Sequence, residues 1–458
     1  MRTAIKLLHE NIAPGAFHNA AERFDAPKCH PQTRKAILQE IMEWIKDIDK
    51  LQSFLWLYGP AGAGKSSIAQ SIAELCQEAG ILDASFFFSR TAAFRNNDRL
   101  LIPTLTYQLS LSIPDILQFI HEALNRDPLV FGRSLQAQID TLLLGPLSQV
   151  AASRQEHGSK SRPLFFIIDG LDECGEANSQ RYILSVLSSA VRCSAIPLFF
   201  LITSRPEQDI RQSFNAEQLN SLTRRLVLDD NYKPDEDIKI FLHSKFDDIK
   251  NNHPLKHFLP ASWPSDSNVE CLVKKSSGQF IYASTVMKFV DSPRHRPTER
   301  LNMILGLQPT GNNMPFAALD ELYMLVLLAV ADIEAVTKVF EVLLVSPLLS
   351  NASIDDLEIF LCLMPGELQI ILSDLHSIIA VPSPQKNANE IRHLRLFHAS
   401  LGDFLLDKGR SGRLYIDARE AHAHLARYCI RHMPMSFLTM GMLNFFVFFC
   451  LNNYRSLL

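Results

Sequence analysis

The sequence predicts an α/β fold in which a five-stranded parallel sheet, wound in both directions and covered by helices, is followed by further helical segments. Apolar runs of strand length recur along the first half of the chain, at 53–58, 84–90, 164–168, 197–204 and 224–228. The runs are apolar at nearly every position, which is typical of strands buried on both faces. Segments with helical periodicity separate the runs, and this alternation favours parallel pairing.

Helices are expected before the first strand and between the strands along the chain. The segment 33–48 places its large apolar residues on one face at helical spacing, and they are Ile37, Ile41, Trp44, Ile45 and Ile48. Further helices are predicted at 66–80, at 100–113, where Pro103 suits a first turn, and at 178–193. The polar stretch 153–162 is expected to be a linker that leads into the strand at 164.

The length of 458 residues predicts several domains rather than one core. Composition and pattern divide the chain into a lead-in segment with an amphipathic helix (1–50), an α/β domain (51–230), a helical domain (231–310), a winged-helix-like domain (311–410) and a helical C-terminal segment of unclear status (411–458). The boundaries near 230 and within 306–316 rest on a turn to helical periodicity and on a stretch with Pro and Gly.

Charge and cysteine content exclude several classes of protein. With 45 Lys and Arg against 49 Asp and Glu, the formal net charge is -4, so no broad basic surface for nucleic acid is expected. The eight cysteines lie apart without metal-ligand spacing, which suits free thiols in a reducing compartment. The N-terminus lacks a secretion signal, and the apolar stretch 442–451 is too short to span a bilayer. A cytoplasmic protein without a membrane segment is therefore expected.

A phosphate-binding motif lies between the first strand and its helix. The stretch "GPAGAGKSS" fills the pattern G-x-x-x-x-G-K-[ST] with Gly59, Gly64, Lys65 and Ser66. Glycines let consecutive backbone N–H groups point at a phosphate, and the helix that follows adds its positive N-terminal end. Lys65 is expected to reach the β- and γ-phosphates and Ser66 to ligate Mg²⁺, with Gly62 and Ser67 completing the nucleotide-binding loop. The fold class is therefore that of a P-loop NTPase domain.

Three carboxylates follow the strand at 164 within five residues. Asp169 comes directly after the apolar run, where a nucleotide site of a parallel sheet needs an acid to hold the Mg²⁺ shell. Either Asp172 or Glu173 is then expected to polarise an attacking water, and spacing does not distinguish the two. The alternative for each is a solvated loop or a helix cap.

Arg205 ends the apolar strand 197–204 and precedes a proline. If this strand lies next to the first, Arg205 emerges beside the γ-phosphate and senses it by a charge-assisted hydrogen bond. A surface arginine at the end of a strand is the alternative.

These motifs resemble those of the NACHT group of STAND signalling NTPases, in the loop 59–66, in "DGLDE" at 169–173 and in "ITSRP" at 202–206. The segment 21–45 is similar to the one that precedes the loop in fungal NACHT proteins. Residues 276–290 are similar to the helical segment after the NTPase core, and 397–405 to the winged-helix stretch that carries the family's histidine. By position, the resemblance implies that His398 contacts the β-phosphate of ADP. Without it, His398 is more simply a packed core histidine.

The resemblance implies a nucleotide-operated switch with roles of the innate-immune or cell-death type. ADP would hold the NTPase core closed, and exchange for ATP would release protomers to self-associate or to meet homotypic partner chains, with slow hydrolysis resetting the state. ATP or ADP with Mg²⁺ is the expected ligand, with GTP left open. The resemblance identifies no effector or sensor partner, and the chain is a core-only member, a partner of another chain or an incomplete product. The alternatives from other classes are a kinase, an AAA-like ATPase motor and a scaffold that binds nucleotide without hydrolysis.

Overall fold

The computed structural model describes residues 2–432 except 24–25, 48–49, 158–160, 230–231, 307–315, 331, 347–348, 350–351 and 382–392. Most of the predicted boundary stretch 306–316 and the apolar stretch 442–451 lie outside the described residues. The chain divides into two compact units. Unit 1 comprises Met1–Arg90 and Phe94–Phe241, and unit 2 comprises Thr91–Ala93 and Leu242–Leu458.

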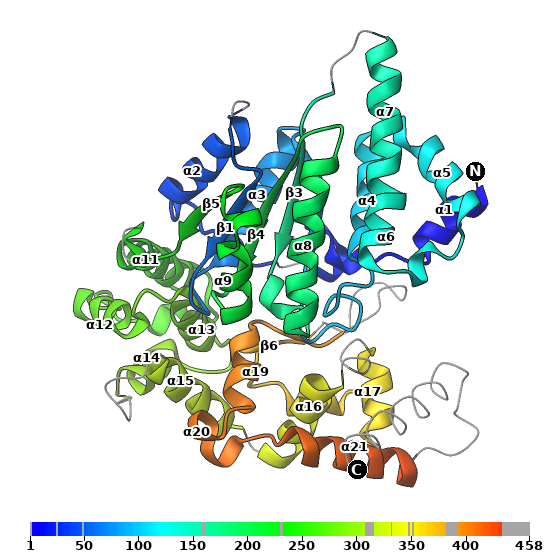
Figure 1. Ribbon diagram of the computed structural model, residues 1–458. Coiled ribbons are helices and arrows are strands. Elements are labelled where there is room, and N and C mark those ends of the chain that lie inside the picture. The colour runs from blue at the N-terminus through cyan, green and yellow to red at the C-terminus, as the bar shows by residue number, and fades with distance from the viewer. Residues whose placement is uncertain are drawn as a thin grey trace. The chain divides into compact units, whose positions relative to one another are not determined.

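Unit 1 is built on a five-stranded parallel sheet, as the sequence predicts (Figure 1). The strands are β1 (Phe54–Tyr58), β2 (Leu82–Phe87), β3 (Leu164–Asp169), β4 (Leu198–Ser204) and β5 (Thr223–Val227). Their order across the sheet is β2-β3-β4-β1-β5, and every neighbouring pair is parallel. The carboxyl ends of all five strands therefore meet at one edge, where polar groups from distant parts of the sequence come together.

The strand order determines how far Asp169 and Arg205 lie from the loop. The strand that ends in Asp169 does not pair with β1, because β4 lies between them. Strand β4 does pair with β1, in a register that sets Ser204 beside Tyr58. Arg205 therefore follows the strand next to the loop, as predicted, and Asp169 lies one strand further away.

Two apolar layers cover the two faces of the sheet. One layer joins α2 (Lys35–Lys46) and α3 (Lys65–Glu78) to alternate strand residues such as Leu55, Phe165 and Ile167. The other joins the opposite strand residues to α4 (Leu101–Ser112), α8 (Ala177–Cys193) and α9 (Gln208–Asn215). Strands β3 and β4 are buried on both faces and read as apolar runs in the sequence, whereas the edge strand β5 exposes Arg224, Arg225 and Val227.

Smaller helices complete unit 1. They are α1 (Arg2–His9), α5 (Ile116–Arg126), α6 (Leu135–Ile139), α7 (Gly145–Glu156), α10 (Glu217–Asn220) and the first part of α11 (Pro234–Asn252). A π-helical turn, Asp140–Leu144, connects α6 to α7. Helix α7 continues through residues 153–156, so the expected linker at 153–162 is wrong in its first part.

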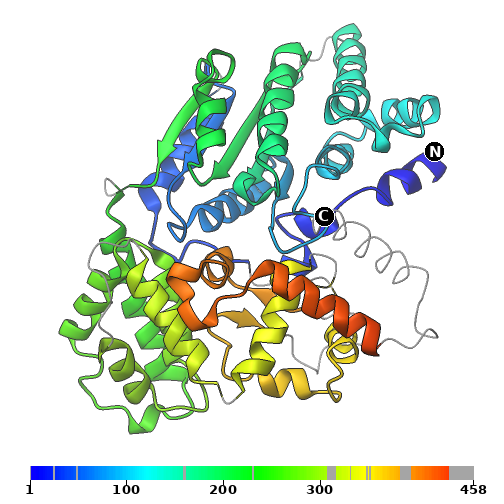
Figure 2. The same ribbon diagram turned by 60° about the horizontal axis from the view of Figure 1, so that its bottom comes forward.

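Unit 2 is mainly helical among the described residues, and Figure 2 shows its later helices in yellow to red. Its helices after α11 are α12 (Asp266–Ser276), α13 (Phe280–Val290), α14 (Pro297–Gly306), α15 (Ala317–Leu328), α16 (Ile333–Val345), α17 (Ile354–Phe360), α18 (Glu367–Ile371), α19 (Ala399–Leu405), α20 (Lys408–Ser411) and α21 (Ala418–His432). Two short antiparallel strands, β6 (Ile379–Ala380) and β7 (Arg395–Leu396), pair within this unit. The winged-helix assignment of this region stays a prediction.

Among the described residues, no helix combines the length and the apolar character that crossing a membrane requires.

Candidate functional site

The loop between β1 and α3 has the backbone shape that its glycines predict. Gly62 and Gly64 have φ angles of 75° and 93°, in the left-handed region that favours glycine. Gly59 is required for a different reason, since a Cβ at this position would lie 2.9 Å from the Cβ of Leu228. Helix α3 begins at Lys65, so Ser66 and Ser67 lie in its first turn, where backbone N–H groups lack partners within the helix.

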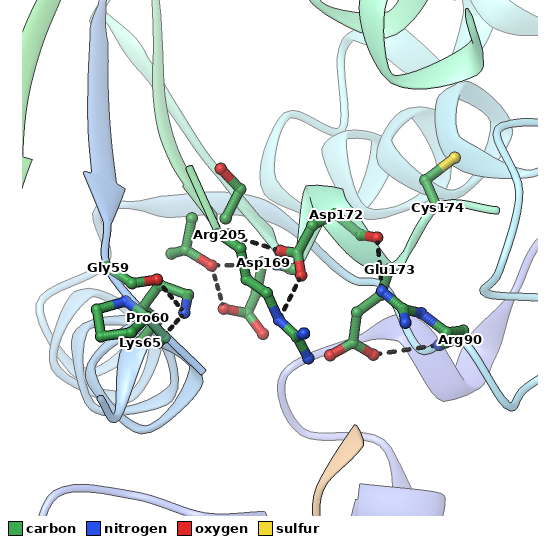
Figure 3. Close-up of polar contacts among 12 residues, drawn as sticks. Gly59, Pro60, Lys65, Arg90, Asp169, Asp172, Glu173, Cys174 and Arg205 are labelled. Carbon is green, nitrogen blue, oxygen red and sulfur yellow. Dashed lines mark hydrogen bonds and ion pairs between the residues drawn. The ribbon is translucent and has the colours of Figure 1, made fainter. Parts of the chain in front are cut away.

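The Lys65 ammonium group folds back over the loop. Its Nζ donates hydrogen bonds to the carbonyl oxygens of Gly59 and Pro60, both at 2.9 Å (Figure 3). Burial lowers the pKa of Lys65, and the Asp172 carboxylate opposes this shift. Since the lysine side chain is long and its partners are two neutral carbonyls, a phosphate group can attract it away from them.

Asp169 lies at the end of β3 and is buried. Its Oδ1 accepts a hydrogen bond of 2.5 Å from Thr203 Oγ1. Burial raises the pKa of Asp169, whereas the nearby hydroxyl groups of Thr203 and Ser66 lower it. Thr203 Oγ1 in turn accepts the backbone N–H of Gly170 at 3.0 Å. The Ser66 hydroxyl, predicted with Asp169 to be a metal ligand, is near enough to influence this carboxyl group, and its role as a ligand stays a prediction.

Asp172 and Arg205 form a buried ion pair (Figure 3). The backbone N–H of Arg205 donates to Asp172 Oδ1 at 2.9 Å, and its Nε lies 3.2 Å from Oδ2. Gly170, with φ 71°, starts the 3-10 turn Leu171–Glu173 that presents Asp172 to the end of β4. Both oxygens of the Asp172 carboxylate are therefore held by a single partner residue.

Glu173 faces the chain that leaves β2. Its Oε2 accepts the backbone N–H of Arg90 at 3.1 Å, and Arg90 Nη2 donates to the carbonyl of Asp172 at 3.3 Å (Figure 3). Burial, followed by the nearby charge of Asp172, raises the pKa of Glu173 to about 7. This carboxyl group can take up or release a proton close to neutral pH.

Arg34 supports the loop from the N-terminal side, and sequence reasoning gave it no role. It is buried, with φ 56°, and its Nη2 donates to the Ala63 carbonyl of the loop at 2.9 Å. Its backbone N–H donates to Asp237 Oδ2 at 2.9 Å. The one available signal was a charged residue just before an amphipathic helix, and that pattern is too common to indicate a tertiary contact.

The donor set beside the loop fits a magnesium ion. Ser66 offers a hydroxyl and Asp169 a carboxylate, the hard oxygen ligands that Mg²⁺ prefers when phosphates and waters complete its shell. Within the described ranges, no group of three or more His, Cys, Asp and Glu side chains is arranged to hold a metal ion.

His398 belongs to unit 2, where it directly precedes α19. The first turn of that helix is anchored by a 3.0 Å hydrogen bond between the hydroxyl groups of Ser400 and Tyr323. Its predicted contact with a nucleotide stays a prediction.

A parallel sheet, a glycine loop that leads into α3, and acids at the ends of neighbouring strands define the first unit as a P-loop NTPase domain. Residues 32–205 match the family model described as "Nephrocystin 3, N-terminal", a NACHT-like region. The resemblance of this part of the chain to the NACHT and STAND P-loop NTPases is confirmed. A search of curated proteins gave no match.

Several solved structures are similar at low identity. A STAND protein with a tetratricopeptide repeat sensor from Pyrococcus horikoshii is 12% identical with a TM-score of 0.42, and the match covers 88% of this chain and 45% of that one. The chain thus spans less than half the length of that protein. The ORC1 protein of Aeropyrum pernix, in complex with DNA, is 14% identical with a TM-score of 0.36, covering 85% and 95% of the two chains. The Cdc6p protein of Pyrobaculum aerophilum is 12% identical with a TM-score of 0.36, covering 82% and 93%.

Proposed function

We propose that the chain is a nucleotide-dependent switch that binds ATP or ADP with Mg²⁺ and hydrolyses ATP slowly. The observation that carries the proposal is the geometry of the loop, in which Gly62 and Gly64 have left-handed φ angles and Lys65 lies over the loop carbonyls at the start of α3. The Ser66 hydroxyl and the Asp169 carboxylate are ligand types that suit a magnesium ion shared with nucleotide phosphates. Lys65 would leave its two loop carbonyls for the phosphates, and the backbone N–H groups at the start of α3 would hold them.

Of the two candidate acids, the contacts favour Glu173 as the group that polarises water. Asp172 is engaged at both oxygens by Arg205, so this carboxylate would orient the arginine rather than accept a proton. A pKa of about 7 suits Glu173 to accept a proton from water near neutral pH. Arg205, fixed by Asp172, would contact the terminal phosphate.

The switch would depend on whether His398 of the second unit contacts the bound nucleotide. In this proposal, His398 contacts ADP in the closed state, and exchange for ATP releases the contact and allows self-association. The resemblance to NACHT proteins supports a signalling role, in a cytoplasmic setting without nucleic acid or membrane as partner.

The test begins with purification of the chain without added nucleotide, followed by denaturation and identification of the released small molecule by chromatography and mass. We expect ADP at about one per chain, and none from Lys65→Ala, while Lys46→Ala on the exposed side of α2 retains it. The rate at which the chain hydrolyses added ATP distinguishes a switch from a motor. Fast, sustained hydrolysis would favour a motor, whereas a folded chain that neither retains nor binds nucleotide would contradict the switch.

A further inference from the structure

The segment before α2 is fixed to the sheet and to α3 of unit 1. Its backbone is held by four hydrogen bonds of 2.9 to 3.0 Å, which join Ala13 N–H to Thr104 Oγ1, His18 N–H to Ser85 Oγ, His18 C=O to Gln70 Nε2, and Cys29 N–H to Ser71 Oγ. Two of these partners, Gln70 and Ser71, lie on the helix that follows the phosphate loop. The segment is therefore part of the domain around the site rather than a separate leader.

Arg23 is the cation that this segment brings to the sheet. Its guanidinium carbon lies 3.9 Å from the centroid of the Phe87 ring, and its Nη2 donates to Gln70 Oε1 at 2.9 Å. An arginine stacked on an aromatic ring and bonded to a side-chain amide has its position fixed by two independent contacts.

Both contacts place Arg23 on the metal-ligand side of the loop. Phe87 pairs in register with Asp169, and it belongs to the apolar layer that contains Phe165 and Ile167, the residues four and two positions before Asp169. Side chains two apart on a strand share a face, so Asp169 and Phe87 lie on the same face of the sheet. Gln70 lies one helical turn after Ser66 in α3.

The positive charge of Arg23 affects the pKa of Asp169. Burial raises the pKa of that carboxyl group, and the positive charge of Arg23 is among the influences that lower it. A guanidinium is charged at every pH at which the protein is folded, so its field at the site is permanent.

We propose that Arg23 is a positioning residue of the nucleotide site, which supplies from the N-terminal segment a fixed positive charge beside Asp169. The inference rests on the proposed nucleotide binding and extends it to a residue before the matched region 32–205. The segment before α2 would then contribute to the affinity for nucleotide, and a displacement of this segment would weaken binding.

The positive charge of Arg23 should affect nucleotide binding differently with and without Mg²⁺. A positive charge attracts the phosphates but repels the metal, and free ATP carries about two more negative charges than its Mg²⁺ complex. Loss of the Arg23 charge should therefore weaken binding of free ATP more than binding of MgATP. A purely structural defect would weaken both to the same degree.

The experiment measures the Kd of a fluorescent ATP analogue for the full chain, once with excess Mg²⁺ and once with EDTA. Arg23→Gln and Arg23→Met remove the charge, and the methionine still packs over Phe87. We expect a loss of about tenfold in EDTA and about threefold in Mg²⁺ for both, with Arg23→Lys within about threefold of the unmodified chain in both media. Lys28→Gln is the matched control, because Lys28 lies in the same segment with its side chain 64% exposed and pairs with Glu74 at 3.5 Å.

Two results would overturn the role of Arg23. One is unchanged affinity of the neutral variants in both media, and the other is an equal loss in both, which indicates a structural effect. If one neutral variant is unstable, the other and Arg23→Lys still decide the comparison. If the unmodified chain and Lys28→Gln both fail to bind the analogue, the proposed function itself is wrong, and the inference falls with it.

Discussion

Asp172 holds Arg205 by two contacts, accepting its backbone N–H at 2.9 Å and lying 3.2 Å from its Nε. The carboxylate is 3% exposed and the arginine 22% exposed, so both charges are largely withdrawn from water. The pair joins the turn after β3 to the end of β4, the two strands that carry the acids and Arg205. A buried pair of this kind is costly to break from one side, because the remaining charge loses its partner.

Removal of this carboxylate should destabilise unit 1. We expect Asp172→Ala to lower the free energy of unfolding by about 2 to 4 kcal/mol, measured by denaturant titration. Asp209→Ala is the matched control, because its pair with Arg181 is 37% and 48% exposed, and a change of at most about 0.5 kcal/mol is expected there. Equal effects of the two substitutions would contradict the importance of the Asp172 pair. A double-mutant cycle with Arg205→Gln then isolates the coupling between the two side chains.

Glu173→Gln should abolish hydrolysis without loss of binding. A glutamine has the same shape and still accepts the Arg90 N–H, but it cannot take a proton from water. We expect kcat to fall by about a hundredfold or more, with the nucleotide Kd changed by less than about threefold. If Glu173→Gln kept the kcat of the unmodified chain, the assignment of the base to Glu173 would be wrong.

The pH dependence of hydrolysis follows from the same group. The active form is the carboxylate, and the pKa of Glu173 is raised to about 7 by burial and by the charge of Asp172. The rate should therefore rise as pH increases through about 7 and fall about tenfold per pH unit well below it. A flat rate between pH 5 and 8, measured under single-turnover conditions at pH values where the fold is intact, contradicts this assignment.

His398→Ala should shorten the retention of ADP and promote self-association. The measurements are the dissociation rate of a fluorescent ADP analogue and the mass distribution in light scattering. We expect dissociation to accelerate about tenfold, the effect of losing one hydrogen bond to a charged phosphate. His257→Ala, at an exposed histidine of the same unit, serves as the control. If the His398 variant held ADP as long as the unmodified chain, the switch role of this residue would be wrong.

Asp83 should matter for stability but not for nucleotide binding. Its carboxylate, 0% exposed, accepts both terminal nitrogens of Arg162, the Ser112 hydroxyl and the backbone N–H of Phe165. Asp83 lies near the amino end of β2, whereas the phosphate loop follows the carboxyl end of β1. We expect Asp83→Ala to cost about 3 to 5 kcal/mol in unfolding free energy, and Arg162→Ala, whose side chain is 46% exposed, clearly less. A smaller effect for Asp83→Ala than for Arg162→Ala would be inconsistent with this account.

The local elements of unit 1 could be predicted from the sequence because each leaves a local signal. Strands β3 and β4 are buried on both faces and therefore read as unbroken apolar runs, and the phosphate loop has a fixed pattern of residue types. The order of the strands leaves no such signal, since it depends on pairing between distant residues, and both partners of β1 lie more than a hundred positions away from it. The prediction for Arg205 was therefore conditional on its strand lying next to the first, and the observed order meets that condition.

The supporting cations of the site were missed for a related reason. Arg23, Arg34 and Arg90 lie in segments that look like ordinary polar connections, and their partners are set only by tertiary structure. Asp172 and Glu173 could not be assigned to separate roles by spacing, whereas their contacts distinguish them. In the second unit, β6 and β7 have two residues each, too few for a periodic pattern.

The strand order has a consequence for how the protein is made. Strand β1, which carries the phosphate loop, pairs only with β4 and β5, and both are synthesised more than a hundred residues later. On the ribosome, β2 and β3 can pair as soon as both have emerged, while β1 has no strand neighbour until residue 204 leaves the exit tunnel. A nascent chain arrested shortly before β4 would therefore expose an apolar strand to chaperones, and the phosphate loop would form only when translation of the NTPase domain is almost complete.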